Sequence, residues 1–332
     1  MIKKVAFFVS ILVLSSCSGT IAHDRTDISL HVWSGLSWRW VESGAEEKAT
    51  KRVIYEEKFG EGNSIRYHQS LSVFGDIAFC FNHGEECRIY DLRTGERQFS
   101  DPLPDKSHHN NAQFSNVYFE PDDELPLLVL SRGDYPPNPN DFYIVRVEEE
   151  DGYYSFSVVK TVHNTIQEAQ NNGSWVIDEE HGKLFLYCMT AGDYRVKNDN
   201  SFCVFSFCLP DITDPEDVTL SYEDVLQKWE YTYLVHQGGT YYNGYLFFNV
   251  QSLSTVEGKD VVSSKSVIAI NASDGRIDIV LPLDDIKETE GISVCNNKLY
   301  VSFKEGSQNQ SATNTVFSLK EYSLPKSIIR GI

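Results

Sequence analysis

Short apolar runs separated by polar turns recur along most of the chain. Four successive runs between residues 240 and 280 are rich in β-branched and aromatic residues, and Gly, Asn and Asp bound them. Runs of this composition and length predict β-strands. The last two are joined by a turn that ends in Asp274-Gly275, and an earlier pair is joined by a turn that ends in Thr94-Gly95. Because glycine supplies the positive φ of tight hairpins, both turns favour antiparallel pairing.

A signature of polar residues followed by a small one returns five times, each time just before the apolar runs of a four-strand unit. Self-similarity at intervals of several tens of residues indicates a repeat architecture. Four short strands per unit, repeated around an axis, are typical of a β-propeller. The sequence therefore predicts an all-β fold, a β-propeller of five four-stranded blades. The five copies read His68-Gln69-Ser70, Asn110-Asn111-Ala112, Asn171-Asn172-Gly173, His236-Gln237-Gly238 and Thr289-Glu290-Gly291.

The fifth unit has three convincing strands, so its fourth strand must come from elsewhere. The run 50–59, which includes Arg52-Val53-Ile54-Tyr55, can supply it and close the ring. Closure of this kind removes the exposed strand edges that invite aggregation. The alternative is a six-bladed ring, in which residues 28–40 build an additional sheet.

Some segments depart from the strand pattern. In the third unit the last strand is assigned to residues 218–220, and the segment 222–231 that follows is capable of forming a helix. Four polar inserts separate the second and third strands of their units, and we expect them as surface loops on one face of the ring. They span residues 134–141, 191–200, 254–264 and 306–314.

The first residues carry the features of an export signal. Lys3-Lys4 precede the apolar run 5–14, which is too short to span a bilayer. The following Leu14-Ser15-Ser16-Cys17 resembles a bacterial lipobox, which implies lipidation of Cys17. Ser18 stands where an aspartate favours inner-membrane retention in enteric bacteria, so we expect an outer-membrane anchor, periplasmic or surface-exposed. The expected organisation is a signal peptide (1–16), a lipidated and partly ordered tether (17–49), one propeller domain (50–324) and a C-terminal tail (325–332).

Charge and cysteine content narrow the functional classes. The formal net charge of −19 repels phosphate backbones and argues against nucleic-acid binding. Six cysteines follow Cys17, and none forms a CxxC pair. Export permits disulfides, and Cys80 could pair with Cys87 across a hairpin. Apolar surroundings favour free, buried thiols for most of the others.

The signature supplies the candidate site, because the first strand of each propeller blade lines the central channel. Its polar groups would converge at the channel mouth as a pocket for a glycan or a peptide. The structural alternative is that these groups hold ordered waters and the backbone between blades. The candidate binding residues are His68, Gln69, His109, Asn111, Asn172, Trp175, His236, Gln237 and Glu290.

Two enzymatic alternatives use the same residues, with Glu290 and His236 as catalytic candidates. Furanosidases and related glycoside hydrolases, which the architecture resembles, need two carboxyl groups about 5 to 9.5 Å apart. Here Glu290 is the acid within the signature, and Glu288 is nearby. A metal-assisted polysaccharide lyase would instead place His68, His109 and His236 around a divalent metal. Apart from that metal, no cofactor is expected.

The blade start Glu290-Gly291-Ile292-Ser293-Val294, followed by Asn297-Lys298-Leu299-Tyr300-Val301, comes in a chain that opens with a lipobox. This pattern resembles exported bacterial β-propeller lipoproteins with TolB-like or related blades, over most of residues 50–324. The resemblance implies a non-catalytic binding or scaffolding module, tethered to the membrane by its lipid. Its expected partner is a glycan or an envelope protein.

Overall fold

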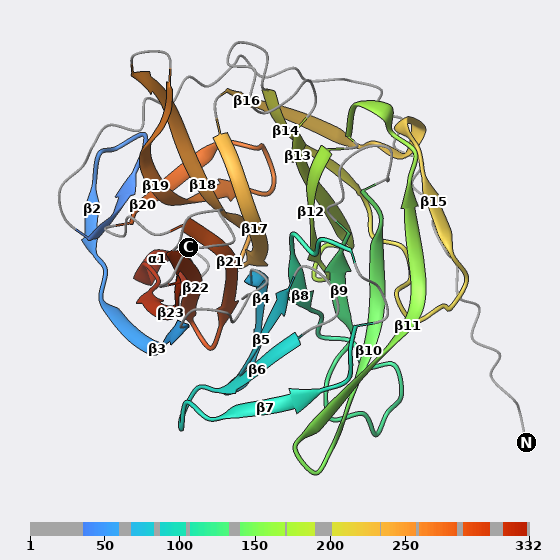
Figure 1. The fold of residues 1–332 in the computed structure, drawn as a ribbon. Helices are drawn as coiled ribbons and strands as arrows, with labels where there is room; N and C mark the ends of the chain where they lie inside the picture. The colour runs from blue at the N-terminus through green and yellow to red at the C-terminus, as the bar shows by residue number, and fades with distance from the viewer. Residues whose placement is uncertain are drawn as a thin grey trace, which may run out of the picture.

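In a computed structural model of the chain, the described strands form four sheets of six, nine, four and four strands (Figure 1). These divide into five antiparallel four-stranded units, here called blades 1 to 5, of which blades 1 and 2 share the nine-stranded sheet. Blade 1 contains β4 (His68–Phe74), β5 (Ile77–Asn82), β6 (Cys87–Asp91) and β7 (Arg97–Ser100). Blade 2 contains β8 (Ala112–Phe114), β9 (Leu128–Ser131), β10 (Phe142–Glu150) and β11 (Tyr153–Asn164). Blade 3 contains β12 (Asn171–Asp178), β13 (Lys183–Met189), β14 (Ser201–Cys208) and β16 (Gln227–Thr232). Blade 4 contains β17 (Leu234–Tyr242), β18 (Tyr245–Val256), β19 (Lys259–Asn271) and β20 (Ile277–Pro282). Blade 5 contains β21 (Glu288–Cys295), β22 (Lys298–Glu305), β23 (Thr315–Ser323) and β3 (Lys51–Phe59).

The structure describes residues 36–59, 68–82, 87–103, 107–132, 140–169, 171–189, 201–232, 234–256, 259–283, 288–305 and 315–330.

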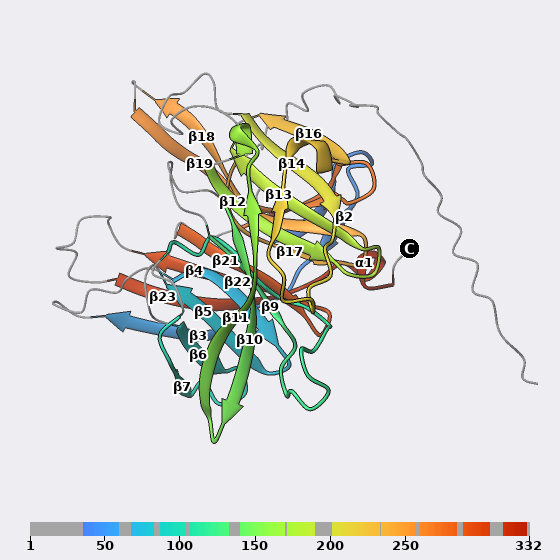
Figure 2. The same cartoon turned by 90° about the vertical axis from the view of Figure 1, so that its right-hand side faces the viewer.

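The blades surround a common axis, so the fold is a β-propeller, as the strand pattern predicts. The first strands β4, β8, β12, β17 and β21 lie at the centre, and each contacts the first strand of the next blade (Figures 1 and 2). Blade strands bury both faces, because apolar residues alternate between the two neighbouring blades. Five clusters of buried residues result, one between each pair of adjacent blades.

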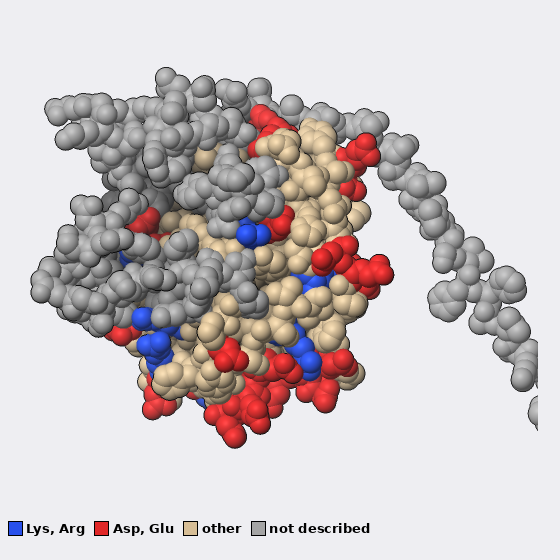
Figure 3. Space-filling view, turned by 45° about the vertical axis from the view of Figure 1, so that its right-hand side comes forward, with Lys and Arg blue, Asp and Glu red and all other residues tan. Residues whose placement is uncertain are grey.

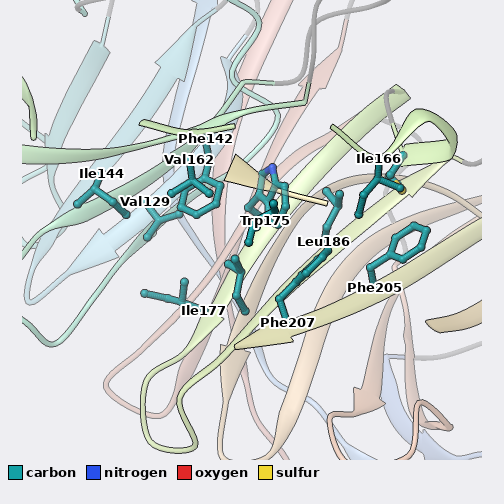
Figure 4. Packing of buried hydrophobic residues seen from close by; sticks show 14 of the residues in the cluster. Val129, Phe142, Ile144, Val162, Ile166, Trp175, Ile177, Leu186, Phe205 and Phe207 are labelled. Carbon is teal, nitrogen blue, oxygen red and sulfur yellow. The ribbon is translucent and has the colours of Figure 1, made fainter. Parts of the chain in front are cut away.

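The cluster between blades 2 and 3 shows this packing (Figure 4). Phe142 on β10 and Trp175 on β12 meet with ring centroids 4.8 Å apart. Phe207 on β14 lies 5.7 Å from the same indole. All three side chains are buried, and burial of an aromatic side chain contributes about 1.5–3 kcal/mol.

The ring closes through the N-terminal strand, and this prediction is confirmed. β3 pairs antiparallel with β23 and becomes the fourth strand of blade 5. Its neighbour Thr50 forms hydrogen bonds with Ser323, and the Trp38 indole donates to the Ser323 carbonyl at 2.7 Å. The two ends of the described chain are therefore fastened to each other.

Residues 37–48 extend blade 4. β1 (Ser37–Trp40) pairs with β20, and β2 (Glu46–Lys48) pairs with β1. The six-bladed alternative instead required an additional sheet from residues 28–40, of which 28–35 lie outside the described residues. In the segment expected as a tail, α1 (Lys326–Arg330) buries Ile328 in the core between blades 4 and 5.

The sequence assignment of blade 3 needs a correction. β15 (Val218–Leu220) pairs parallel with β11 of blade 2, not with its own blade. The fourth strand is β16, from the segment expected to be helical, where η2 (Tyr222–Asp224) is a single 3₁₀ turn. Trp229 and Tyr231 are buried there and alternate with Lys228 and Glu230, which form an ion pair at 3.3 Å. That alternation has the period of a strand.

The insert 254–264 is also different from the expected loop. β18 and β19 continue through it as a paired hairpin, with residues 257–258 outside the described part. Most of the other three inserts lies outside the described residues as well. Asp and Glu outnumber Lys and Arg on the face shown in Figure 3, and they gather at its lower edge, the end at which the β10–β11 hairpin tip lies. No helix within the described ranges is long and apolar enough to cross a membrane.

Candidate functional site

The signature lies on the inner strands, where it interrupts their pairing with the second strands. In blades 1, 3, 4 and 5 the register between these strands shifts at the signature. Such a β-bulge adds a residue to one strand and redirects the nearby side chains. The extra residue is Gln69 in blade 1 and Glu290 in blade 5. We call this end of the channel the signature end.

Small signature residues bring neighbouring inner strands unusually close. A Cβ added to Gly291 would lie 2.4 Å from the Leu71 backbone nitrogen of blade 1. A Cβ added to Gly238 would lie 3.2 Å from the Ile292 nitrogen of blade 5. The small residues of the signature therefore let adjacent backbones approach closely.

Asn111 uses both ends of its amide to join blades. Its Nδ2 donates to the Trp175 carbonyl of blade 3 at 2.8 Å, and its Oδ1 accepts from the Gly239 nitrogen of blade 4 at 2.9 Å. The side chain is fully buried. Gln113, on the same strand, forms two bonds with the Ile177 backbone, at 3.0 and 3.1 Å. Both amides thus hold the ring together.

Two serines complete these contacts, and sequence reasoning missed them together with Gln113. Ser72 Oγ accepts from the Phe114 nitrogen and joins blades 1 and 2. Ser293 Oγ accepts from the Val73 nitrogen and joins blades 5 and 1. Both distances are 3.0 Å. The available signal was a small polar residue two positions after the first, fourth and fifth signatures, inside an apolar run.

Trp175 is one of the candidate binding residues, but the structure places it in the core. Its side chain is 0% exposed and packs against Phe142 and Phe207 (Figure 4). Its indole nitrogen donates to the Asn140 carbonyl at 2.8 Å. Because the ring is enclosed by core and its polar atom is used, Trp175 stabilises the interface between blades 2 and 3.

The other candidate polar groups lie in separate surroundings. His109 is buried, with Nδ1 3.2 Å from the Ser131 carbonyl, and Gln69 Oε1 contacts His108 Nε2. Within the described ranges, no three His, Cys, Asp or Glu side chains come together as metal ligands. The side chains of His68, Asn172 and His236, and all of Cys17, lie outside what the structure describes.

Glu290 is 1% exposed and lies beside a lysine. Its Oε1 is 3.8 Å from Lys304 Nζ, and the same ammonium is 3.9 Å from Glu288 Oε2. Burial, and then the charge of Glu288, raise the pKa of Glu290 well above its ordinary value, while Lys304 opposes this shift. Burial also lowers the pKa of Lys304. Two carboxyl groups therefore flank one buried lysine side chain at the signature end.

Gln237 lies directly opposite Asn249 on the second strand of blade 4. Asn249 is fully buried, and neither its amide oxygen nor its amide nitrogen has a hydrogen-bond partner among the described residues. The same holds for Gln237 Oε1 and Glu290 Oε2. Polar groups of this kind are usually satisfied by buried water.

A cavity occupies the opposite end of the channel, where the first strands turn into the second. Its volume is about 530 Å³, and none of the predicted binding residues lines it. All five inner strands contribute, because all five run toward this end. We call it the turn-end cavity. Its lining includes Ser72, Phe74, Gln113, Phe114, Asn116, Glu179, Glu180, Tyr241, Tyr242, Asn243, Ser293, Cys295 and Asn296.

Glu179 is the acidic group most firmly held in this cavity. Its Oε2 accepts from the Asn116 backbone nitrogen at 2.6 Å and from Asn116 Nδ2 at 3.0 Å. Its Oε1 is buried, and no group in the described part of the chain pairs with it. Burial raises the pKa of Glu179 above its ordinary value, although the two bonds from Asn116 oppose that shift. Glu179 therefore contributes to the cavity wall a fixed carboxylate, of which one oxygen is paired with Asn116 and the other is buried.

Hydrogen bonds fix much of the cavity rim. The Tyr241 hydroxyl accepts from the Gly244 nitrogen at 3.0 Å and lies 3.3 Å from His181 Nδ1. The Tyr242 hydroxyl donates to Asn297. Tyr241 and Tyr242 end β17, whereas their partners lie in the turns between first and second strands, and Asn297 has a positive φ of 61°. The arrangement can hold a ligand by shape, aromatic contact and one carboxylate.

Fold and channel define the chain as a β-propeller with a polar central channel and a cavity at one end. No protein-family model and no curated protein matches the sequence. Among solved structures, the chain is similar to BamB from Moraxella catarrhalis, with 10% identity, a TM-score of 0.32, and coverage of 76% of this chain and 84% of that one. It is also similar to a GH43 endo-arabinanase from Bacillus licheniformis, with 13% identity, a TM-score of 0.38, and coverage of 78% and 96%. An exo-1,5-α-L-arabinanase from a bovine ruminal metagenomic library has 8% identity, a TM-score of 0.44, and coverage of 75% and 90%.

Proposed function

We propose that this chain is a lipid-anchored β-propeller of the bacterial cell envelope, and that it binds a ligand without chemical turnover. One observation carries the proposal. All five inner strands line a single cavity of about 530 Å³, and the side chains around it are held by hydrogen bonds. Cavities of this size are typical of ligand sites that are formed before binding. A glycan or a peptide would enter here, rather than at the signature end.

Residues at the signature end already contact other parts of the protein, and this supports the same proposal. Asn111 uses its amide on the backbones of two other blades. Trp175 belongs to the core. A ligand at that end would have to displace contacts that hold the ring together, whereas the turn-end cavity is open without such a change.

Cys295 provides the test, because it lines the turn-end cavity as a half-buried free thiol. We expect the best hit from glycan and peptide arrays to slow modification of Cys295 by a small methanethiosulfonate reagent. Mass spectrometry of the modified peptides measures the rate. Cys208 is exposed and free, and its rate is the internal control. Ligand binding that protects neither thiol, or that survives complete modification of Cys295, would place the ligand elsewhere.

The lipid anchor is a proposal from the sequence, and a single substitution tests it. Cys17→Ser removes the thiol that would carry the lipid, so the protein should lose a metabolic fatty-acid label and leave the membrane fraction. Cys208→Ser is the matched control and should keep both properties. An unlabelled wild-type protein would exclude the anchor.

The enzymatic alternative is favoured by one observation at the signature end. Glu288 and Glu290 contact the same lysine, so two carboxyl groups come close together beside a channel. A glycoside hydrolase or a metal-assisted lyase with its acid there should lose turnover in Glu290→Gln, and in His236→Ala for the lyase. The screen uses a polysaccharide panel with and without divalent metals, and thermal melting confirms that each variant folds. No turnover by the wild-type protein on that panel contradicts the alternative.

A further inference from the structure

Most polar side chains around the turn-end cavity already have partners within the protein. Asn243 Nδ2 donates to the Ile328 carbonyl at 2.9 Å, and Asn296 Nδ2 donates to the Gly75 carbonyl at 3.4 Å. Gln113, Ser72, Ser293, Tyr241 and Tyr242 make the contacts described above. Among the lining residues within the described ranges, Glu179 Oε1 is the buried side-chain polar atom for which no described partner is present. A ligand that fits the cavity therefore needs a hydrogen-bond donor at this place.

Aromatic rings supply much of the remaining lining. Phe74 and Phe114 are half-buried, with ring centroids 5.6 Å apart. Tyr241 and Tyr242 are half-buried on the inner strand of blade 4. Aromatic faces attract cations, and their apolar surface suits an aliphatic stem.

The charge of the cavity has one sign. Of the residues that the structure describes, its lining includes Glu179 and Glu180 and no lysine or arginine. The whole chain carries a net charge of −19, which draws cationic partners toward it. An anionic ligand would meet an uncompensated carboxylate, whereas a cation would neutralise it.

We propose that the turn-end cavity takes the alkylammonium group of a lysine side chain from a partner peptide segment, with its ammonium paired with the Glu179 carboxylate. This inference rests on the proposed function, because it names the ligand class of the same site. Lysine fits better than arginine, because Asn116 occupies Oε2 and leaves one carboxylate oxygen. An ammonium group binds as a point charge, whereas a guanidinium prefers both oxygens of a carboxylate. The stem of the side chain lies along the rings of Phe74, Phe114 and Tyr241.

Three peptides test this inference on the purified full-length protein in saturation-transfer NMR titrations. The probes are acetyl-Gly-Lys-Gly-amide, its Nε-acetylated form, and the arginine analogue. We expect the lysine peptide to bind, and acetylation to weaken it by about tenfold or more, because a charge-assisted hydrogen bond contributes about 1.5–3 kcal/mol. The arginine peptide should bind more weakly than the lysine peptide.

Glu179→Gln should weaken the lysine peptide by a similar factor, because the amide keeps an acceptor for Asn116 but loses the charge. Glu216→Gln, on the exposed segment between β14 and β15, makes the same charge change elsewhere and should bind as the wild type does. Equal binding of the acetylated peptide, or unchanged binding by a folded Glu179→Gln, overturns the inference. If that variant does not fold, the comparison of peptides on the wild-type protein decides.

The two proposals fail in different ways. A glycan that protects Cys295, together with no binding of the lysine peptide, rejects the lysine site and leaves the binding function standing. If the lysine peptide binds without protecting Cys295, it is not in this cavity, and the inference is again wrong. If neither the array hits nor the peptide protects Cys295, both proposals fail.

Discussion

Gly291→Ala is expected to lower the free energy of unfolding by at least about 3 kcal/mol, near the upper end for overpacked sites. The added methyl group would lie 2.4 Å from the Leu71 nitrogen and 2.7 Å from the Ser70 carbonyl carbon. Both are backbone atoms of the adjacent inner strand, so no side chain can rotate away. Blades 5 and 1 must separate, which weakens the ring at the point where it closes. Urea denaturation followed by tryptophan fluorescence measures the change.

Gly152→Ala is the control for glycine replacement itself. Gly152 lies in the β10–β11 turn with a φ of +80°, and a Cβ added to it would have nothing within 4 Å. Its replacement should cost only the strain of a left-handed residue, about 1–2 kcal/mol. Equal losses in the two variants would show that the close approach of blades 5 and 1 contributes nothing measurable.

Asn111→Ala is expected to cost about 3 kcal/mol, because it leaves two buried backbone groups unpaired and each costs about 1–3 kcal/mol. The Trp175 carbonyl and the Gly239 nitrogen lose their partner at once. Gln113→Ala is the matched comparison. It also removes two bonds to backbone, but its site is half-buried, so water can replace the amide and the loss should be about 1 kcal/mol.

Chemical denaturation of both variants gives the two free energies. If Asn111→Ala lowers the free energy of unfolding no more than Gln113→Ala does, the Asn111 amide does not hold three blades together. The signature would then again be a candidate for ligand binding. A much larger loss in Asn111→Ala would show that Asn111 stabilises the ring.

The strand pattern predicted the fold because each blade repeats the same local pattern of apolar runs and turns. Apolar runs, turn glycines and the missing fourth strand of the last blade all follow from nearby residues, and β3 could be assigned by elimination. Blade 3 shows where the rule fails. Val218–Leu220 has strand composition, but pairing decides to which sheet a strand belongs, and β15 pairs with blade 2. The period-two burial of Trp229 and Tyr231 identifies the true fourth strand.

The candidate site was harder to predict for a physical reason. The signature attracts attention because its polar residues stand out from apolar surroundings, yet Asn111 is polar in order to satisfy backbone atoms of other blades. The turn-end cavity is built from hairpin turns, where Asn116, Glu179 and Asn296 have the composition of any exposed turn. Only the ring brings these turns together. A pattern along one strand cannot reveal a pocket shared by five.

The pairing of β3 with β23 also sets the order in which the molecule can fold. The amino end of a chain emerges first, from a ribosome or through a membrane channel, but β3 has no partner until the last described strand has arrived. Contacts between such distant segments form slowly, because a long loop must first be closed. A chain that is exported through a membrane gains from this delay, since the ring cannot close before the whole chain has passed. Loss of the residues after 314 would leave blade 5 with exposed strand edges. These edges would pair with other chains, so the protein would aggregate instead of closing its ring.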